Sequence, residues 1–460
     1  MSRAQTFRRV ATGARIAVGT VVAAACVTGV VLAIHAPWPA VSHEPAQVDV
    51  VPLAGDPVLA CTGDLQALGR DSSDPLALRS AGAFDLVAGG TAGDPAQTAI
   101  AAPDLVDGGE VPRLSDTVDG RSAPLIAGAE SITAAASDLA GFAAAPCGEA
   151  RLESWLVGGS VATGTKDLIV LTNASSVTST VTLSVHGESR SNRTLVIPAR
   201  TQTTLPLSSI AAGNTSPVVE VAAQGAPVRA VLQSSFVRTL DPAGIDLQDA
   251  VAAPQRSLVV PGVRVFDGEG DDADLTVLRL LAPDDAGSAV VTVRAAGSRS
   301  SVQEFTVPLT ADLPTDVSLR DLPAGSYTVD VVSDAPVVAG VRQQDGFGAG
   351  SDFAWNTPAS EITSEALFAV PAGPSARVQF VNRGDDDATV ELARIDGDDG
   401  EQITVPSGGS VEADVEAGTV YRLTTNEAVH AGVAMAGDGA LATWPIAPSA
   451  GAEGSITVYP

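Results

Sequence analysis

The sequence predicts an all-β protein made of tandem immunoglobulin-like β-sandwich modules, preceded by one N-terminal transmembrane helix. Three observations predict this class. The chain has 460 residues, which is too long for a single core and suits domains of about 100 residues. A pattern of alternating apolar residues recurs along it. The composition, with 45 Gly, 30 Pro and 4% aromatic residues, favours strands and turns over long helices.

Residues 16–35 are the predicted transmembrane helix. The stretch 16–34, IAVGTVVAAACVTGVVLAI, carries no charge, and at about 1.5 Å per residue it just crosses a hydrocarbon core of about 30 Å. Arginines precede it, and acidic residues outnumber basic ones in the chain after it. The positive-inside rule therefore places residues 1–15 in the cytoplasm and the chain from about residue 40 outside. These arginines are Arg3, Arg8, Arg9 and Arg15.

The competing interpretation of this segment is a cleaved signal peptide. Val31, Leu32 and Ala33 offer small residues at which a signal peptidase can cut. The apolar run is longer than the about 7–15 residues of a usual signal core, which favours a retained anchor. Cys26 lies inside this run, and because apolar residues continue past it, we interpret it as a thiol within the helix and not as a lipidated residue.

The net charge of −28 disfavours nucleic acid and anionic membrane surfaces as partners. Such contacts need Lys and Arg to neutralise phosphates, and Lys166 is the single lysine of the sequence. We expect the acidity to keep an extracytoplasmic body soluble.

A repeated strand pattern sets the predicted module boundaries. Residues 168–187, LIVLTNASSVTSTVTLSVHG, predict a hairpin, and related runs occupy 275–297 and 377–397. Val181 and Leu183 alternate with polar residues, which predicts strands with one buried face. A period near 100 residues matches a whole sandwich. We therefore predict module 2 (residues 151–258), module 3 (259–364) and module 4 (365–460), each with its own core.

A diverged module 1 is predicted at residues 48–150, after a linker at 36–47. Each later copy opens with a segment such as WLVGG, LVVPG or LFAVPAG and closes with a segment such as IDLQDAVAAPQ, SDFAWNTPAS or ALATWPIAPSA. The stretch 137–147, SDLAGFAAAPC, resembles these closing segments, and 50–63 resembles 370–382. Between them, residues 64–122 are rich in Gly and Asp and show weak periodicity, so no strand order is predicted there.

Two cysteines outside the apolar run predict a disulfide. Cys61 and Cys147 fall on the predicted first and last strands of module 1, in an oxidising compartment. A bond between them closes a loop of 86 residues, worth ~4 kcal/mol through the unfolded state. The alternative is two free thiols, but no basic residue nearby in sequence would activate them.

No motif for catalysis, cofactor binding or metal binding is found in the sequence, so we predict none of these sites. The histidines are isolated, and HExxH, GxSxG and SxxK motifs are missing. They are His35, His43, His186 and His430. The acidic run 267–272 is a weak calcium candidate, because Asp272 stands where an EF-hand loop has Gly and no bidentate Glu ends the loop.

Carbohydrate-binding modules usually expose a flat platform of aromatic side chains, and the tryptophans are the candidates for one. Trp155, Trp355 and Trp444 lie on predicted opening or closing strands. We expect them in cores or module junctions, because a Trp ring buries ~150–250 Å² and small sandwiches need that area.

The run 141–190 resembles the actinobacterial family of unknown function DUF5719. The shared features are a Cys before a W-[LF]-V-G-G opening, a T-x-G step and an L-x-L-x-N-x-x hairpin with alternating Val, here with Cys147, Trp155 and Asn173. Ala174 follows Asn173 where Pro is expected. The resemblance covers the chain from about residue 15 to 460. The resemblance implies a cell-envelope protein. Genes of this family lie near genes of envelope glycosyltransferases, which implies a link to surface polysaccharide. The resemblance supplies no catalytic residues.

The predicted function is that of a non-catalytic, membrane-anchored extracytoplasmic structural or interaction protein of the bacterial cell envelope. Its expected partners are the cell membrane, through residues 16–35, and envelope proteins or polysaccharide, with no nucleic acid. The first alternative is a glycan-binding accessory of envelope polysaccharide assembly, which an exposed Trp platform would favour. The second is an extracellular hydrolase using Asp or Glu, which a cleft with two facing carboxylates would favour.

Overall fold

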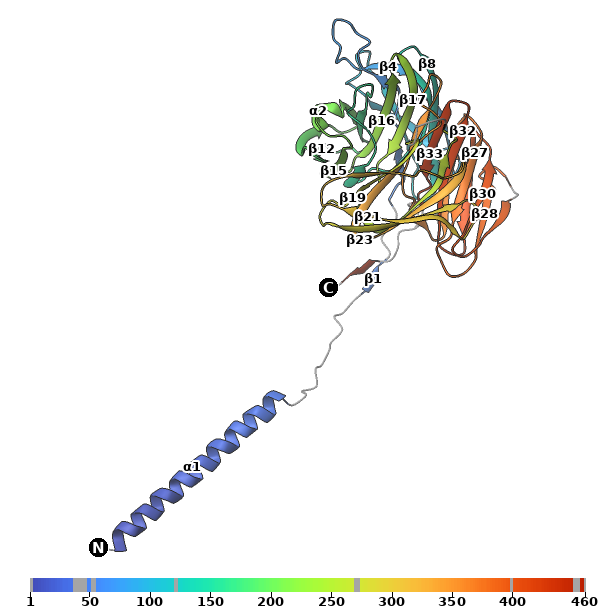
Figure 1. Cartoon of the computed structure of the whole chain (residues 1–460). Helices are drawn as coiled ribbons and strands as arrows, with labels where there is room; N and C mark the ends of the chain where they lie inside the picture. Colours follow the sequence, from blue (N-terminus) through green and yellow to red (C-terminus); the bar gives the residue numbers. More distant parts are fainter. Residues whose placement is uncertain are drawn as a thin grey trace. The chain divides into compact units, whose positions relative to one another are not determined.

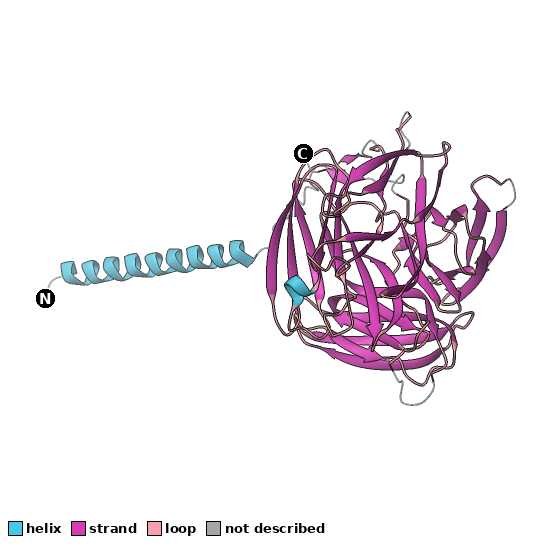
Figure 2. Cartoon of the chain, turned by 90° about the horizontal axis from the view of Figure 1, so that it is seen from above, coloured by secondary structure: helices cyan, strands magenta, loops and turns pink. Residues whose placement is uncertain are grey.

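The computed structural model of the chain describes residues 3–35, 48–50, 55–119, 123–268, 274–397, 400–449 and 456–458. The chain forms two compact units, residues 1–52 with 454–460, and residues 53–453. The second unit is called the body below. Strands are the main regular structure of the body, and the predicted class of tandem immunoglobulin-like β-sandwiches behind one N-terminal helix is confirmed (Figure 1, Figure 2).

The first unit contains helix α1 (Arg3–His35), of which Gly13–His35 is long and apolar enough to cross a membrane or to serve as a signal sequence. Two hydroxyls in this stretch are satisfied within the helix. Thr20 donates to the carbonyl of Ile16 at 2.9 Å, and Thr28 donates to that of Ala24 at 2.8 Å, which suits an apolar environment. Strand β1 (Val48–Val50) pairs antiparallel with β34 (Ile456–Val458).

Three copies of one eight-strand topology make up most of the body. In module 2, one sheet has the order β10-β15-β12-β13 and the other contains β17-β16-β11-β14. Its strands are β10 (Glu153–Leu156), β11 (Leu168–Asn173), β12 (Ser179–His186), β13 (Ser191–Ile197), β14 (Thr201–Pro206), β15 (Val218–Gln224), β16 (Arg229–Arg238) and β17 (Asp241–Asp249). The short helix α2 (Ser208–Ala211) lies between β14 and β15.

Module 3 repeats this order as β18-β23-β20-β21 and β24-β23-β19-β22. The long strand β23 replaces two strands, because its first half pairs with β18 and β20 and its second half with β19 and β24. The strands are β18 (Gln255–Val265), β19 (Thr276–Leu281), β20 (Gly287–Ala295), β21 (Ser301–Leu309), β22 (Thr315–Ser318), β23 (Gly325–Gln344) and β24 (Phe353–Asn356).

Module 4 repeats it again as β26-β31-β28-β29 and β33-β32-β27-β30, with β25 added beside β32. The strands are β25 (Glu361–Ile362), β26 (Glu365–Val370), β27 (Ala376–Val381), β28 (Ala388–Arg394), β29 (Gly400–Val405), β30 (Ser410–Val415), β31 (Thr419–Thr425), β32 (Val429–Gly437) and β33 (Ala440–Pro445). The same neighbours recur in all three copies, so the repeat is structural.

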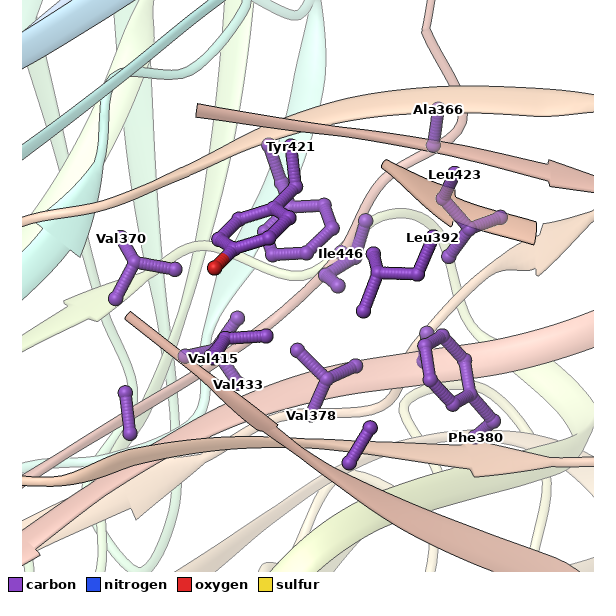
Figure 3. Close-up of a cluster of buried hydrophobic side chains, with 14 of the residues drawn as sticks. Ala366, Val370, Val378, Phe380, Leu392, Val415, Tyr421, Leu423, Val433 and Ile446 are labelled. Atoms are coloured by element: carbon purple, nitrogen blue, oxygen red, sulfur yellow. The ribbon is translucent and has the colours of Figure 1, made fainter. Parts of the chain in front are cut away.

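Each of these modules has its own hydrophobic core. Leu183, Val291 and Val390 are fully buried in three different clusters, one in each module. In module 4 the rings of Phe368 and Tyr421 stack with centroids 5.5 Å apart, and Figure 3 shows Tyr421 among other buried side chains of this core. The predicted alternation and the three separate cores are confirmed.

The predicted hairpin at 168–187 is wrong. Strands β11 and β12 do not pair with each other but lie in opposite sheets of the sandwich. The buried Asn173 supplies the physical reason, because its amide donates to the carbonyls of Val177 (2.8 Å) and Ile197 (3.1 Å) and so holds the chain in an arch. Asn382 repeats this in module 4, donating to Asp386 (2.8 Å) and Val405 (3.1 Å).

Module 1 is built differently. Strands β5, β8 and β9 form one sheet, β3 pairs with β4, and β2, β7 and β6 extend the module 2 sheet beyond β14. The strands are β2 (Val58–Ala60), β3 (Leu65–Ala67), β4 (Arg79–Gly82), β5 (Asp85–Gly90), β6 (Ala96–Ala101), β7 (Glu110–Ser115), β8 (Ile126–Ala136) and β9 (Leu139–Pro146). The predicted module boundaries stay a prediction, since residues 53–453 form one compact unit.

Candidate functional site

The four closing segments of the repeat meet at the centre of the body. Strand β9 packs against β17, β17 against β24, β24 against β33, and β33 against β9. We call these four strands the central ring. Because module 4 thereby contacts module 1, the four modules form a closed circle and not an open row.

One buried carboxylate ties the central ring together. Asp352, immediately before β24, has no exposed surface. Its carboxylate accepts hydrogen bonds from the backbone N–H groups of Phe142 (2.9 Å), Ile245 (3.1 Å) and Leu441 (2.9 Å). Each donor belongs to a different closing strand, so modules 1, 2 and 4 all bond to one side chain of module 3.

Small residues in the neighbouring strands make room for this carboxylate. Gly141 and Gly244 stand where module 3 has Asp352, and a Cβ on either would lie 2.7 Å from its Oδ1 atom. Their φ angles are 140° and 119°, values that favour glycine. Burial raises the pKa of Asp352 well above its ordinary value, and the backbone donors oppose this shift.

Polar side chains also cross every seam between adjacent modules. Arg279 of module 3 donates to the Gly159 carbonyl of module 2 (2.8 Å), binds Asp316 and lies over the ring of Trp355. The other seams are crossed by Arg229 to Pro146 O (2.6 Å), by Arg383 to Asp330 (2.6 Å) and by Ser131 to Ala372 O (2.6 Å). Of these contacts between modules, Arg383–Asp330 is an ion pair, and the others are hydrogen bonds to backbone carbonyls.

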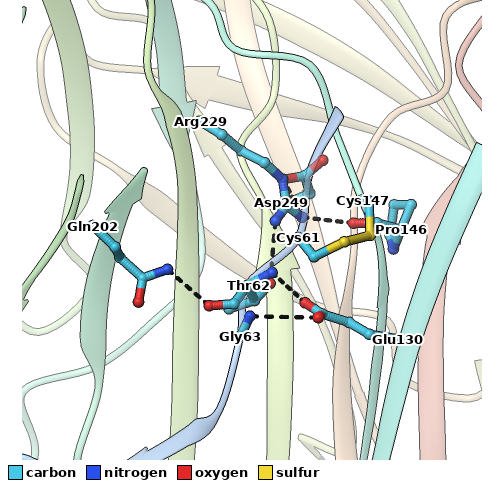
Figure 4. Close-up of a disulfide and its surroundings, with 9 residues drawn as sticks. All are labelled: Cys61, Thr62, Gly63, Glu130, Pro146, Cys147, Gln202, Arg229 and Asp249. Atoms are coloured by element: carbon cyan, nitrogen blue, oxygen red, sulfur yellow. Dashed lines mark hydrogen bonds and ion pairs between the residues drawn. A yellow bond between two sulfur atoms is a disulfide. The ribbon is translucent and has the colours of Figure 1, made fainter. Parts of the chain in front are cut away.

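The predicted disulfide is present in the structure. Cys61 follows β2 and Cys147 follows β9, so the bond joins two different sheets of the body (Figure 4). Beside it, Glu130 accepts from the backbone of Thr62 and of Gly63 (3.4 Å). Burial raises the pKa of Glu130, while Arg229 opposes the shift.

A pocket of about 310 Å³ opens at the other end of the closing strands, and we call it the central pocket. All four modules line it, with Ile126 from module 1, Val251 from module 2, Val338 from module 3, and Phe368 and Trp444 from module 4. This size lies at the lower end of small-molecule sites, which span about 300–1,000 Å³.

Three charged side chains are among the described residues that line the central pocket: Glu149, Arg151 and Asp249. Asp249 pairs with Arg229 at 3.2 Å. Glu149 is exposed to solvent, but the protein around its carboxyl group desolvates it and so raises its pKa. The charge of nearby Arg151 acts in the opposite direction and lowers that pKa. Sequence reasoning missed this pocket, because its residues come from strand ends far apart in the chain.

The histidines take structural positions. His430 contacts the Ala359 carbonyl at 2.8 Å, and burial lowers its pKa. His186 pairs with Asp312 across the seam between modules 2 and 3, and His35 contacts the Val31 carbonyl within α1. His43 lies outside the described residues, as does most of the weak calcium candidate at 267–272. Within the described ranges, no group of three or more His, Cys, Asp or Glu side chains is placed to hold a metal.

The tryptophans lie where they were predicted. Trp155, Trp355 and Trp444 are 4%, 5% and 3% exposed. Trp155 packs with Val338 at the junction of modules 2 and 3, while Trp444 belongs to the module 4 core. None of these three rings offers a flat exposed surface to a sugar.

Comparisons with known proteins identify a family. The model of the family of unknown function DUF5719 matches residues 101–424. No curated protein sequence matches the chain. Among solved structures, the FN1–FN3 domains of chicken CNTN1 align with 12% identity over 65% of this chain and 97% of that one, at a TM-score of 0.11.

Proposed function

This chain belongs to the DUF5719 family, and we propose that it acts as a non-catalytic, membrane-anchored structural or interaction protein of the bacterial cell envelope. The observation that carries the proposal is the bonding of Asp352 to three other modules. A body fixed in this way at its centre keeps its outer surfaces in constant relative positions. Such rigidity suits presentation of several binding surfaces at once.

Helix α1 supports the anchoring part of the proposal. The stretch Gly13–His35 is long and apolar enough to span a bilayer. Four arginines lie before or at its start, and the following chain is acidic. We propose that the helix is retained, with the N-terminus in the cytoplasm and the body outside.

A fractionation experiment tests this topology. The full chain should stay with membranes after a carbonate wash, and protease added to intact cells should reach the body. N-terminal sequencing distinguishes the alternative, because a signal peptide would leave a soluble protein that begins near Ile34. Recovery of that form alone would refute the anchor.

The hydrolase remains a second candidate because of one observation. Glu149 and Asp249 both line the central pocket, and their surroundings differ, since Glu149 has a raised pKa and Asp249 pairs with Arg229. Glycoside hydrolases use two carboxyl groups in one site, one of which has a raised pKa and acts as the general acid. Release of reducing sugar from envelope polysaccharide, lost in Glu149→Gln, would establish this function in place of the first.

The glycan-binding alternative has less support, because the three described tryptophans are buried. Binding of envelope polysaccharide to the immobilised full chain would favour it.

A further inference from the structure

Apolar residues outnumber polar ones on the lining of the central pocket. Its described walls include Leu59, Ile126, Leu258, Val338 and Phe368, and small alanines separate these larger side chains. Most small-molecule sites combine an apolar wall with a few polar groups. Among its described residues the charged groups are the three described above, and the uncharged polar side chains are Gln255, Thr357, Ser360 and Ser449. The lining therefore accommodates a ligand that has both an apolar part and a polar head.

The pocket also offers few free hydrogen-bond donors. Six prolines line it, and proline has no N–H group. They are Pro57, Pro124, Pro146, Pro358, Pro445 and Pro448. Three further backbone donors there are already used, since the N–H groups of Val251, Ala359 and Ile446 bond to carbonyls at 2.8–2.9 Å. An added peptide strand needs alternating donors and acceptors, so it fits this lining poorly.

The first residue of the pocket lining follows helix α1 closely in the sequence. Pro57, on the lining, follows His35, the last residue of α1, by 22 positions. A chain of that length spans at most about 75 Å even when fully extended. If α1 is a membrane anchor, the lining at Pro57 stays within that distance of the bilayer surface.

We propose that the central pocket binds the acyl or isoprenoid chain of a membrane lipid. The apolar wall accommodates the hydrocarbon, and Arg151 and Glu149 at the lining provide polar contacts for its head group. This proposal rests on the anchoring in the proposed function and names a ligand class for the body.

Tryptophan quenching tests the proposal, because Trp444 lines the pocket. The full chain, reconstituted in phosphatidylcholine nanodiscs, is titrated with 12-bromododecanoic acid, whose bromine quenches tryptophan on contact. Unbrominated dodecanoic acid serves as the matched probe. We expect saturable quenching by the brominated acid, and we expect Trp444→Phe to remove the saturable part.

Two matched variants separate pocket binding from partition into the nanodisc. Ala253→Phe places a ring at an exposed position on the pocket lining, and Ala286→Phe places one at an exposed position in the β19–β20 turn. Ala253→Phe should weaken binding by about tenfold or more, while Ala286→Phe should leave it unchanged. Both variants should keep the Cys61–Cys147 disulfide, which a thiol count verifies.

Three results would overturn the proposal: no saturable quenching in the folded wild-type chain, equal effects of the two alanine variants, or displacement of the acid by a proline-rich peptide. The fractionation experiment shows independently whether the chain is anchored. A soluble chain that still shows pocket quenching would remove the membrane source of the ligand, whereas an anchored chain without quenching would remove the pocket.

Discussion

The carboxylate of Asp352 accepts a hydrogen bond from the backbone N–H of Phe142, 210 residues earlier in the chain, at 2.9 Å. The same carboxylate bonds to Ile245 and Leu441. This contact joins the first and third modules directly, although the second lies between them in the sequence. It makes the stability of each module depend on the others.

Removing the Asp352 carboxylate should destabilise the whole body. Asp352→Ala leaves three buried N–H groups without a partner, and each costs about 1–3 kcal/mol. Asp352→Asn should cost less, because the amide oxygen still accepts. Guanidinium denaturation of the full chain measures both. Asp284→Ala, at an exposed turn, is the control and should leave the midpoint unchanged. Equal midpoints for Asp352→Ala and the control would contradict the role of this carboxylate.

Replacing Val291 should unfold more than module 3. Val291→Asp buries an unpaired carboxylate in the core at a cost of several kcal/mol. The sequence, with its separate cores, suggests that neighbouring modules would stay folded. We expect instead a single transition, because module 3 supplies both Asp352 and Arg279 to its neighbours. Limited proteolysis decides, since surviving fragments of modules 2 and 4 would support independent folding.

Reducing the disulfide should lower stability without changing the fold. The bond closes a loop of 86 residues, and its loss should cost ~4 kcal/mol, mainly by freeing the unfolded chain. Denaturation of wild type and of the Cys61→Ser, Cys147→Ser double variant measures the difference. A thiol titration of the native chain should find one free thiol, Cys26. Two additional reactive thiols in the native oxidised chain would disprove the pairing.

Stability should fall as the pH rises from about 4 to 8. Burial raises the pKa of Asp246 to about 8 and that of Asp167 to about 7. Both carboxyls have a pKa near 3.9 when the chain unfolds. Within that window the folded chain binds more protons than the unfolded one, so each pH unit removes up to about 1.4 kcal/mol per group.

Asp246→Asn tests the assignment of this slope. The amide oxygen can still accept the hydrogen bond from the backbone N–H of Trp355, which lies 2.9 Å from the Asp246 carboxylate. Urea denaturation at pH 5 and pH 8 should show a smaller difference for Asp246→Asn than for wild type. If the stability difference between pH 5 and pH 8 is the same in Asp246→Asn and wild type, groups other than Asp246 cause the pH dependence.

The sequence predicts the modules better than it predicts their assembly. Alternating apolar residues such as Val181 and Leu183 define strands locally, and their spacing reveals the repeat. Which strands pair depends on contacts between residues far apart in the sequence. The local pattern therefore predicts that the consecutive strands β11 and β12 pair, although they lie in different sheets. The buried Asn173 was visible in the sequence, but its bonds to Val177 and Ile197 exist only after the sandwich forms.

The central ring was partly visible as well. The closing segments were recognised as alike, but similarity does not show that they converge. One signal was available in their alignment: Asp352 stands where the other copies have Gly141, Gly244 and Ala440. A single acidic residue at a position that is otherwise Gly or Ala indicates that its carboxylate has hydrogen-bond partners there. The central pocket left no such signal, because it draws single residues from many strand ends.

The position of Pro57 and Ser449 on the lining of one pocket has a mechanical consequence. In a linear row of sandwiches, tension applied at one end passes through every module in series. Here the described body begins and ends at neighbouring points on a closed circle, so a pull between its two ends acts across one junction, that of modules 1 and 4. The modules opposite lie outside the shortest path between those ends, and we expect the body to resist such a pull as one unit.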